Sequence, residues 1–333
     1  MPTPTRSGAQ LHVVTGKGGT GKTTVAAALA LALASRGQDV LLCEVEGRQG
    51  IARLFDVDPL PYAERRIAVG TGNGEKQGAL YGLHIDPESA LLEYLAMYYK
   101  LGRAGKALDR FGVIEFATTL APGVRDVLLT GKVYEAAKPG RRGKDVRQYD
   151  AVVLDAPPTG RIAQFLGVNS ELAGLAKVGP IKSQADQVMK LFRSQRTRIH
   201  LVTVLEEMPV QETADGIEEL RDHGFPLGSV VVNLVRPQDL GADDLAALTS
   251  GDVEPAAVAT DLKAAGIEAD DALVEGLLAE ARDHAVRRAL EDSQRELVAQ
   301  LDVPTVELPR LPGGADLGGL YELAGSLCEQ GMA

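Results

Sequence analysis

Residues 11–24 read LHVVTGKGGTGKTT, and this stretch with its surroundings decides the fold. The apolar run 11–15 ends at a cluster of glycines, which is typical of a buried strand in a parallel sheet. An Ala- and Leu-rich stretch follows and stops at Gly37, which predicts a helix that is apolar on nearly all sides. Residues 39–47, DVLLCEVEG, form a second buried strand. Together they make a βαβ unit, which predicts a parallel sheet.

The glycines in this stretch fit two phosphate-binding patterns. Gly16, Gly18 and Gly21 spell G-x-G-x-x-G, the fingerprint of dinucleotide-binding proteins. That fingerprint requires an acidic residue at the end of the second strand, where Glu44 and Glu46 lie. These features alone leave the dinucleotide interpretation open.

Lys22 and Thr23 favour a nucleoside triphosphate over a dinucleotide. They complete the pattern G-x-x-x-x-G-K-T, in which the lysine contacts the β- and γ-phosphates and the hydroxyl binds magnesium. Backbone N–H groups at the start of the helix hold the phosphate oxygens. The remaining alternative is a glycine turn without a ligand. The other residues expected to line the phosphates are Gly18, Gly19, Thr20, Gly21 and Thr24.

A second acidic element is expected near the magnesium ion. Residues 149–160, YDAVVLDAPPTG, contain a buried strand that ends at Asp155 and a loop with proline and glycine. Ligands of open parallel sheets bind at the carboxyl ends of the strands. Asp155 is a turn or cap residue in one interpretation and a magnesium-site carboxylate in the other. The phosphate loop favours the second.

Composition excludes several classes of protein. The chain has 333 residues and a net charge of -11, which disfavours non-specific binding to nucleic acid or anionic lipid. Cys43 and Cys328 have no metal-ligand spacing, so a structural zinc site is not expected. No apolar run is long enough for a membrane span, and residues 1–10 do not resemble a secretory signal. We therefore expect a cytoplasmic protein.

The expected fold is α/β, a phosphate-loop NTPase with a mostly parallel central sheet, flanking helices and an inserted helical subdomain. The spacing of apolar residues after Pro87, and two more helical stretches, indicate the insertion. Residues 238–272 have weak periodicity and are expected to be loosely structured. The predicted organisation is a nucleotide-binding core at 1–86, the helical insertion at 87–138 and the rest of the core at 139–333. Within this last part, residues 159–197 are expected to belong partly to the helical subdomain, and residues 238–300 to form a variable helical insertion.

Several motifs resemble one family. The sequence KGGTGKTT is similar to the deviant phosphate loop of dimeric ATPases that have an early signature lysine. DAPPTG, APGVRDVLLTGKVYE and VTVLEEMPVQETADGIEEL resemble segments of the arsenite-pump ATPases and of the ATPases that target tail-anchored membrane proteins. Actinobacterial single-copy anion-transporting ATPases with CEVEGRQ look most similar. The resemblance covers most of 11–235 and about the last 30 residues, and is weakest in 238–300.

The resemblance implies a nucleotide-sandwich dimer that binds ATP and Mg²⁺. Lys17 would reach the phosphates bound by the other subunit, so that hydrolysis requires closure; alternatively it is a solvent-exposed loop lysine. Thr23 and Asp155 would hold the magnesium site. Asn233 would hydrogen-bond adenine, bordered by the loop at Pro309, although Asn233 as a turn residue is a competing interpretation.

The chain departs from the family pattern after its second strand. The family has Asp-Pro-Ala-His, whose Asp orients the attacking water, whereas this chain has EVEGRQ with Glu46 at the Asp position. A longer carboxylate changes the distance to the water, and misplacement of this order reduces rate. We therefore expect slow or partner-dependent hydrolysis.

Three functions stay open. The first is an ATP-driven carrier or targeting factor, a homodimer or a heterodimer with a paralogous ATPase, whose helical insertion forms an apolar groove for a membrane-protein client. The second is the energising subunit of an anion exporter. The third is a nucleotide-binding partner subunit with little activity of its own. The groove candidates, which could equally be helical-domain core, are Leu91, Leu92, Leu95, Tyr98, Tyr99, Val127, Leu128 and Tyr134.

Overall fold

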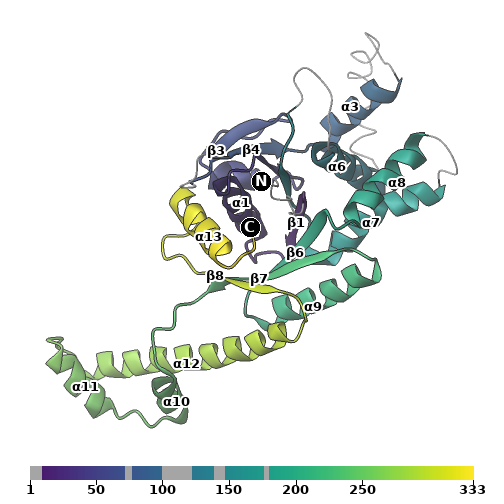
Figure 1. The fold of residues 1–333 in the computed structure, drawn as a ribbon. Helices are drawn as coiled ribbons and strands as arrows, with labels where there is room; N and C mark the ends of the chain where they lie inside the picture. Colours follow the sequence, from purple (N-terminus) through teal and green to yellow (C-terminus); the bar gives the residue numbers. More distant parts are fainter. Residues whose placement is uncertain (1–9, 72–76, 100–121, 139–146, 176–179) are drawn as a thin grey trace, which may run out of the picture.

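A central sheet organises the molecule. The computed structural model describes residues 10–71, 77–99, 122–138, 147–175 and 180–333. In these parts the sheet has eight strands in the order β3-β4-β2-β5-β1-β6-β7-β8 (Figure 1). All neighbouring pairs are parallel except β3 and β4. The strands are β1 (Leu11–Gly16), β2 (Val40–Glu44), β3 (Arg65–Val69), β4 (Ala79–His84), β5 (Ala151–Asp155), β6 (Thr197–Thr203), β7 (Leu227–Val235) and β8 (Thr305–Pro309).

Helices cover both faces of the sheet, which confirms the predicted α/β class. One face packs against α1 (Lys22–Ser35), α2 (Gly50–Leu54) and α13 (Leu317–Glu329). The other packs against α6 (Pro122–Ala137), α7 (Thr159–Leu175), α8 (Pro180–Phe192) and α9 (Glu207–Asp222). Ten consecutive residues of α1, Val25 to Ala34, are buried, because the helix lies between the sheet and α13.

Two strands were missed from the sequence. Strand β3 is antiparallel and lies at the edge of the sheet, and its residues are only partly buried. Strand β4 lies inside it and pairs with β2. An edge strand needs no continuous apolar run, and Arg65 and Arg66 obscure the pattern.

The inserted helices pack onto the core beside α7. Helix α3 (Pro87–Tyr99) precedes α6, and the Lys132 amine of α6 lies 2.8 Å from the Glu93 carboxylate of α3. The Asn169 amide of α7 donates to the buried Thr130 hydroxyl of α6 over 2.8 Å. The boundary of a helical subdomain at 87–138 stays a prediction. No helix of the described ranges is long and apolar enough to cross a membrane.

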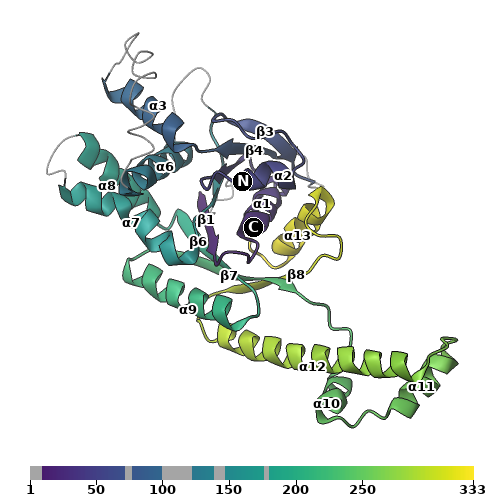
Figure 2. The ribbon, with the colours of Figure 1, turned by 180° about the vertical axis from the view of Figure 1, so that it is seen from behind.

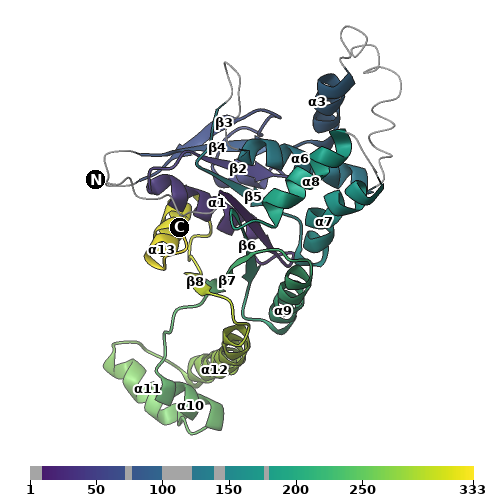
Figure 3. The ribbon, with the colours of Figure 1, turned by 45° about the vertical axis from the view of Figure 1, so that its right-hand side comes forward.

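A helical arm extends from the end of the sheet where β7 and β8 lie (Figures 1 and 2). Its helices are α10 (Ala242–Ser250), α11 (Pro255–Ala264) and α12 (Asp271–Ala299). The expectation of a loosely structured 238–272 is wrong, since α10 and α11 fall there. They lie along α12 (Figure 3) and share a small core with it, which explains how segments of weak periodicity become helical. The buried residues of this core are Leu248, Val274, Leu278 and Ala285.

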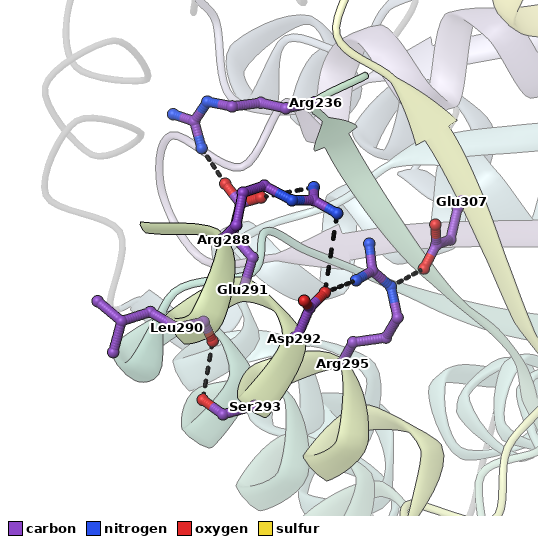
Figure 4. A network of polar contacts seen from close by, with 8 residues as sticks. All are labelled: Arg236, Arg288, Leu290, Glu291, Asp292, Ser293, Arg295 and Glu307. Atoms are coloured by element: carbon purple, nitrogen blue, oxygen red, sulfur yellow. Dashed lines mark hydrogen bonds and ion pairs between the residues drawn. The ribbon is translucent and has the colours of Figure 1, made fainter. Parts of the chain in front are cut away.

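Ion pairs fix the base of α12 to the sheet (Figure 4). Glu291 is buried and accepts from Arg236, which follows β7, and from Arg288 on its own helix. Arg295 donates to Glu307 of β8 over 2.8 Å. Both strands that border the arm are therefore held to α12.

A pair of histidines joins two central strands inside the sheet. The backbone N–H of Ser229 donates to His200 Nδ1 over 3.1 Å, so Nδ1 is the unprotonated nitrogen. His200 Nε2 then donates to His12 Nδ1, 3.1 Å away. Burial is the main reason that the pKa of His200 lies well below its usual value, and the positive charge of Arg198 contributes to the decrease. The folded protein therefore holds His200 neutral.

We predict that this histidine makes the fold sensitive to acid. A histidine with a depressed pKa stays neutral in the folded protein, whereas in the unfolded chain it takes up a proton below pH ~6.5. Its contribution to stability is therefore present above that pH. Below it, the free energy of unfolding falls by about 1.4 kcal/mol per pH unit. Urea unfolding is measured for the wild type and His200→Gln at pH ~7.5 and ~5.5. Between these pH values the free energy of unfolding should fall less in the variant than in the wild type. The exposed His223→Gln serves as control. Equal losses in all three proteins would contradict the assignment.

Candidate functional site

The phosphate loop lies between β1 and α1, as the sequence predicts. Gly19 and Gly21 have φ angles of 93° and 87°, which glycine adopts readily. No side chain caps the start of α1, and its first turn contains no acidic residue. The N–H groups at this helix start are therefore available to an anion, which the helix dipole also favours.

The space around the loop fits a phosphate chain. A Cβ on Gly18 or Gly19 would meet no atom within 4 Å, so the loop faces open space there. A Cβ on Gly21 would lie 2.4 Å from the Asn233 amide nitrogen. That nitrogen donates to the Thr20 carbonyl over 2.9 Å and so fixes the loop from the end of β7. Thr20 adds a hydrogen bond from its hydroxyl to the Lys17 carbonyl.

The predicted magnesium residues are brought together. The Thr23 hydroxyl donates to Asp155 Oδ2 over 2.7 Å, although 132 positions separate them in the chain. Asp155 ends β5, which pairs with β1 in parallel register, and it is 6% exposed. Its second oxygen, Oδ1, is buried without a hydrogen-bond partner. A hydroxyl and an unpartnered carboxylate beside a phosphate loop fit a hydrated Mg²⁺ ion.

The electrostatics of Asp155 point the same way. The pKa of Asp155 is raised to about 7, chiefly by burial and in addition by the negative charges of Glu44 and Glu46. The Thr23 hydrogen bond and the positive charge of Lys22 oppose this rise in pKa. A bound cation would compensate the buried negative charge.

The two lysines of the loop differ in their surroundings. Lys22 begins α1 and contributes positive charge to the Asp155 site. The Lys17 amine lies 2.7 Å from Glu212 Oε1 of α9 in the same chain. Both side chains of this pair are about one-third exposed, at 30% and 37%. Lys17 is thus an accessible lysine at the mouth of the site with a carboxylate partner.

Glu46 and Glu44 have different positions at the end of β2. Glu46 is half-buried in the loop before α2. Glu44 is 2% exposed and accepts a hydrogen bond from Gly50 N over 2.7 Å. From the sequence, Glu44 is a candidate only for a dinucleotide site, and neither Gly50 nor Glu212 is predicted to take part. The signal for Glu44 was a carboxylate at the end of an apolar strand.

The two residues predicted to border adenine lie at the ends of adjacent strands. Asn233 is 4% exposed near the end of β7, and Pro309 is exposed at the end of β8. Val235 and Pro309 pair across the two strands. One N–H of the Asn233 amide is bonded to the loop, so its second N–H and its carbonyl oxygen are left for a base. The roles of Asn233 and Pro309 in binding adenine stay predictions. Thr24, predicted to line the phosphates, is half-buried in the first turn of α1.

A mostly parallel sheet whose first strand runs into such a loop and helix is the fold of the phosphate-loop nucleoside triphosphatases. The loop thus defines the class of protein, and comparison with known families shows to which family of that class the chain belongs. A family model described as Anion-transporting ATPase matches residues 9–196, which is more than half of the chain. The chain belongs to this family.

Individual relatives agree with this assignment. ATPase BagA of Mycobacterium tuberculosis is 53% identical over 329 residues, which cover 98% of this chain and 94% of BagA. The arsenical pump-driving ATPase of Escherichia coli is 28% identical over 74% of this chain and 42% of its own length. ATPase get3 of Neurospora crassa is 25% identical over 69% of this chain and 74% of get3. The expected resemblance is confirmed.

We predict that Asp155→Asn stabilises the protein without nucleotide or magnesium. A carboxyl group whose folded pKa is raised to about 7 contributes stability at low pH, and that stability is lost as pH rises through the folded value. The amide keeps an oxygen to accept from Thr23. Thermal unfolding at pH ~8 should show a gain on the order of a few kcal/mol that shrinks toward pH ~4. A variant less stable than wild type at the higher pH would contradict this.

Proposed function

We propose that this chain is a Mg²⁺-dependent ATPase that works as a dimer, either with itself or with a related ATPase. Opening and closing of the dimer would be coupled to handling of a membrane-protein client or of an anion-export partner. The proposal rests above all on the contact between Thr23 and Asp155, which builds a magnesium-type site beside the phosphate loop. The names of the relatives support ATPase activity.

Within one chain the residues have separate tasks in this mechanism. The N–H groups of residues 18–23 and the Lys22 amine would bind the phosphates of ATP. Thr23 and Asp155 would hold the Mg²⁺ ion, which neutralises charge on the β- and γ-phosphates. Glu46, half-buried beside this site, would orient the attacking water. Its extra methylene relative to Asp is the reason to expect slow turnover.

Lys17 supports the dimer part of the proposal. Its amine is paired with Glu212 of its own chain, and exposed ion pairs contribute only about 0–1 kcal/mol. The lysine can therefore exchange this carboxylate for a phosphate at small cost. A lysine supplied by a partner subunit would stabilise the charge of phosphoryl transfer only when the dimer closes.

The loop after Asp155 connects the nucleotide site to the inserted helices. Residues 156–158 lead directly into α7, whose Arg161 lies 3.3 Å from Asp126 of α6. Asp126 is 4% exposed, and burial raises its pKa above the usual value. Movement of the loop with the γ-phosphate would thus reach α6 through this ion pair.

The groove candidates are placed only in part. Leu91 and Leu128 are buried at 7% and 8% exposure, which fits core packing. Leu92 is 39% exposed, and Val127 is half-buried. The Tyr134 hydroxyl donates to Gln187 over 2.7 Å. The side chains of Leu95, Tyr98 and Tyr99 lie outside the described residues.

The alternative is a nucleotide-binding partner subunit with little activity of its own. The pairing of Lys17 with Glu212 is compatible with it, because the lysine has a carboxylate partner within its own chain. One assay distinguishes the two proposals. ATP binding and ATP turnover are measured for this protein alone and mixed with candidate related ATPases, and binding without turnover in every combination supports the alternative.

We predict that Lys17→Ala lowers kcat for ATP by about tenfold or more, the scale of losing one transition-state cation. Affinity for ATP should change less than kcat, because the lysine acts mainly on the charge that develops in the transition state. Steady-state turnover and a binding titration with a non-hydrolysable ATP analogue measure the two effects. An unchanged kcat would contradict the role given to Lys17.

We further predict that Glu212→Gln favours the closed dimer. The variant keeps the shape of the side chain and removes the charge that competes for Lys17. Sedimentation with the ATP analogue should show more dimer than the wild type, whereas Glu218→Gln on the same helix should behave as the wild type. Equal dimer fractions in all three proteins would show that the ion pair does not compete with closure.

A further inference from the structure

The unexplained feature of the site is the buried carboxylate of Glu44. Glu44 ends β2 and is 2% exposed. Gly50 N donates to its Oε1 over 2.7 Å, and its Oε2 is buried without a hydrogen-bond partner. Burying a carboxylate without full compensation is expensive. A side chain needed only to accept from Gly50 would not have to be charged.

Glu44 is the middle member of a row of titratable side chains at the carboxyl edge of the sheet. It pairs in register with His84 of β4 on one side and with Asp155 of β5 on the other. His84 Nδ1 lies 3.7 Å from Glu44 Oε2 and is itself buried without a hydrogen bond. Neighbours in register project from the same face, and this face is the one covered by α1. The row therefore runs toward Thr23.

Gly50 shows how close Glu44 comes to the candidate magnesium residues. A Cβ on Gly50 would lie 3.4 Å from Glu44 Oε1 and 3.1 Å from Thr23 Cγ2. Gly50 is therefore packed between the two side chains. The negative charge of Glu44 also contributes to the raised pKa of Asp155. The two carboxylates thus act on the same small volume.

We propose that Glu44 is a positioning residue of the nucleotide site, which supplies a second negative charge toward the hydrated magnesium ion and fixes the loop that carries Glu46. This inference rests on the proposed function of the site. Among the described residues, no three His, Cys, Asp or Glu side chains are close enough together to hold a metal ion by themselves. Gly50 lies between Glu44 and Thr23, so the role proposed for Glu44 is to act on the water molecules around the metal.

The loop contacts explain the second part of this role. The hydrogen bond between Glu44 and Gly50 closes the turn in which Glu46 lies. Gln49, next to Gly50, fixes the same end of the turn, since its side chain accepts from Leu60 N over 2.8 Å and donates to Leu60 O over 3.2 Å. Gln49 itself has a left-handed φ of 53°. Glu44 thus couples the charge of the metal site to the position of Glu46.

Glu44→Gln tests the proposal, because the amide oxygen can still accept from Gly50 while the charge is lost. ADP-induced thermal stabilisation is measured across a magnesium titration, and kcat and KM are measured with ATP. We expect the half-saturating Mg²⁺ concentration to rise about tenfold or more, as for other groups that orient metal ligands. At saturating magnesium, kcat should fall while KM for ATP stays near the wild-type value.

Glu291→Gln is the matched control, since Glu291 is also a buried glutamate but lies at the base of the arm. It should leave the magnesium dependence unchanged. Wild-type magnesium dependence and kcat in Glu44→Gln would overturn the proposal. Without metal, Glu44→Gln should be more stable than the wild type, because removal of the charge relieves repulsion between carboxylates. A variant less stable than the wild type under these conditions would also overturn the proposal.

The wild-type protein separates this inference from the proposed function. If the wild type gains no magnesium-dependent stabilisation from ADP or ATP, the proposed function itself fails. If the wild type responds and Glu44→Gln responds identically, only the role of Glu44 fails.

Discussion

The parallel alignment of the central strands is the constraint on which the other features depend. Parallel strands that are covered by helices on both faces leave their carboxyl ends as the place where polar side chains can meet a ligand. Strands β1, β5, β2 and β4 end side by side. Because of this alignment, Thr23 and Asp155 form a hydrogen bond of 2.7 Å across 132 positions of sequence. Glu44 and His84 join the same edge through strand register.

This edge is built at a cost to the stability of the protein without ligand. Asp155 and Glu44 are both buried, and each has an oxygen without a hydrogen-bond partner. Lys22 opposes only part of the negative charge near Asp155. Such an arrangement is unfavourable as pure architecture, and a bound cation would compensate it. The charge balance therefore indicates a ligand more directly than the glycine loop does.

The helical additions are joined to the strands and loops that form the site. Arg161 and Asp126 connect the helix after the Asp155 loop with α6. At the other end of the sheet, Arg236 and Glu291 hold the arm to the end of β7, which also carries Asn233 (Figure 4). Ion pairs therefore join both helical parts to the elements that form the candidate site.

The sequence by itself determined the phosphate loop and the parallel βαβ unit, because these depend on local patterns. It also predicted that Thr23 and Asp155 belong to one site, because parallel strands end at the same edge of a sheet. It did not reveal β3, since an edge strand carries no continuous apolar run, nor the inner strand β4 that pairs with it. It missed α10 and α11, which gain their burial only by packing on α12. Only the tertiary structure decided that Lys17 contacts Glu212 and that Glu44 lies beside Thr23, because strand register and helix packing, which no local pattern encodes, bring these side chains together.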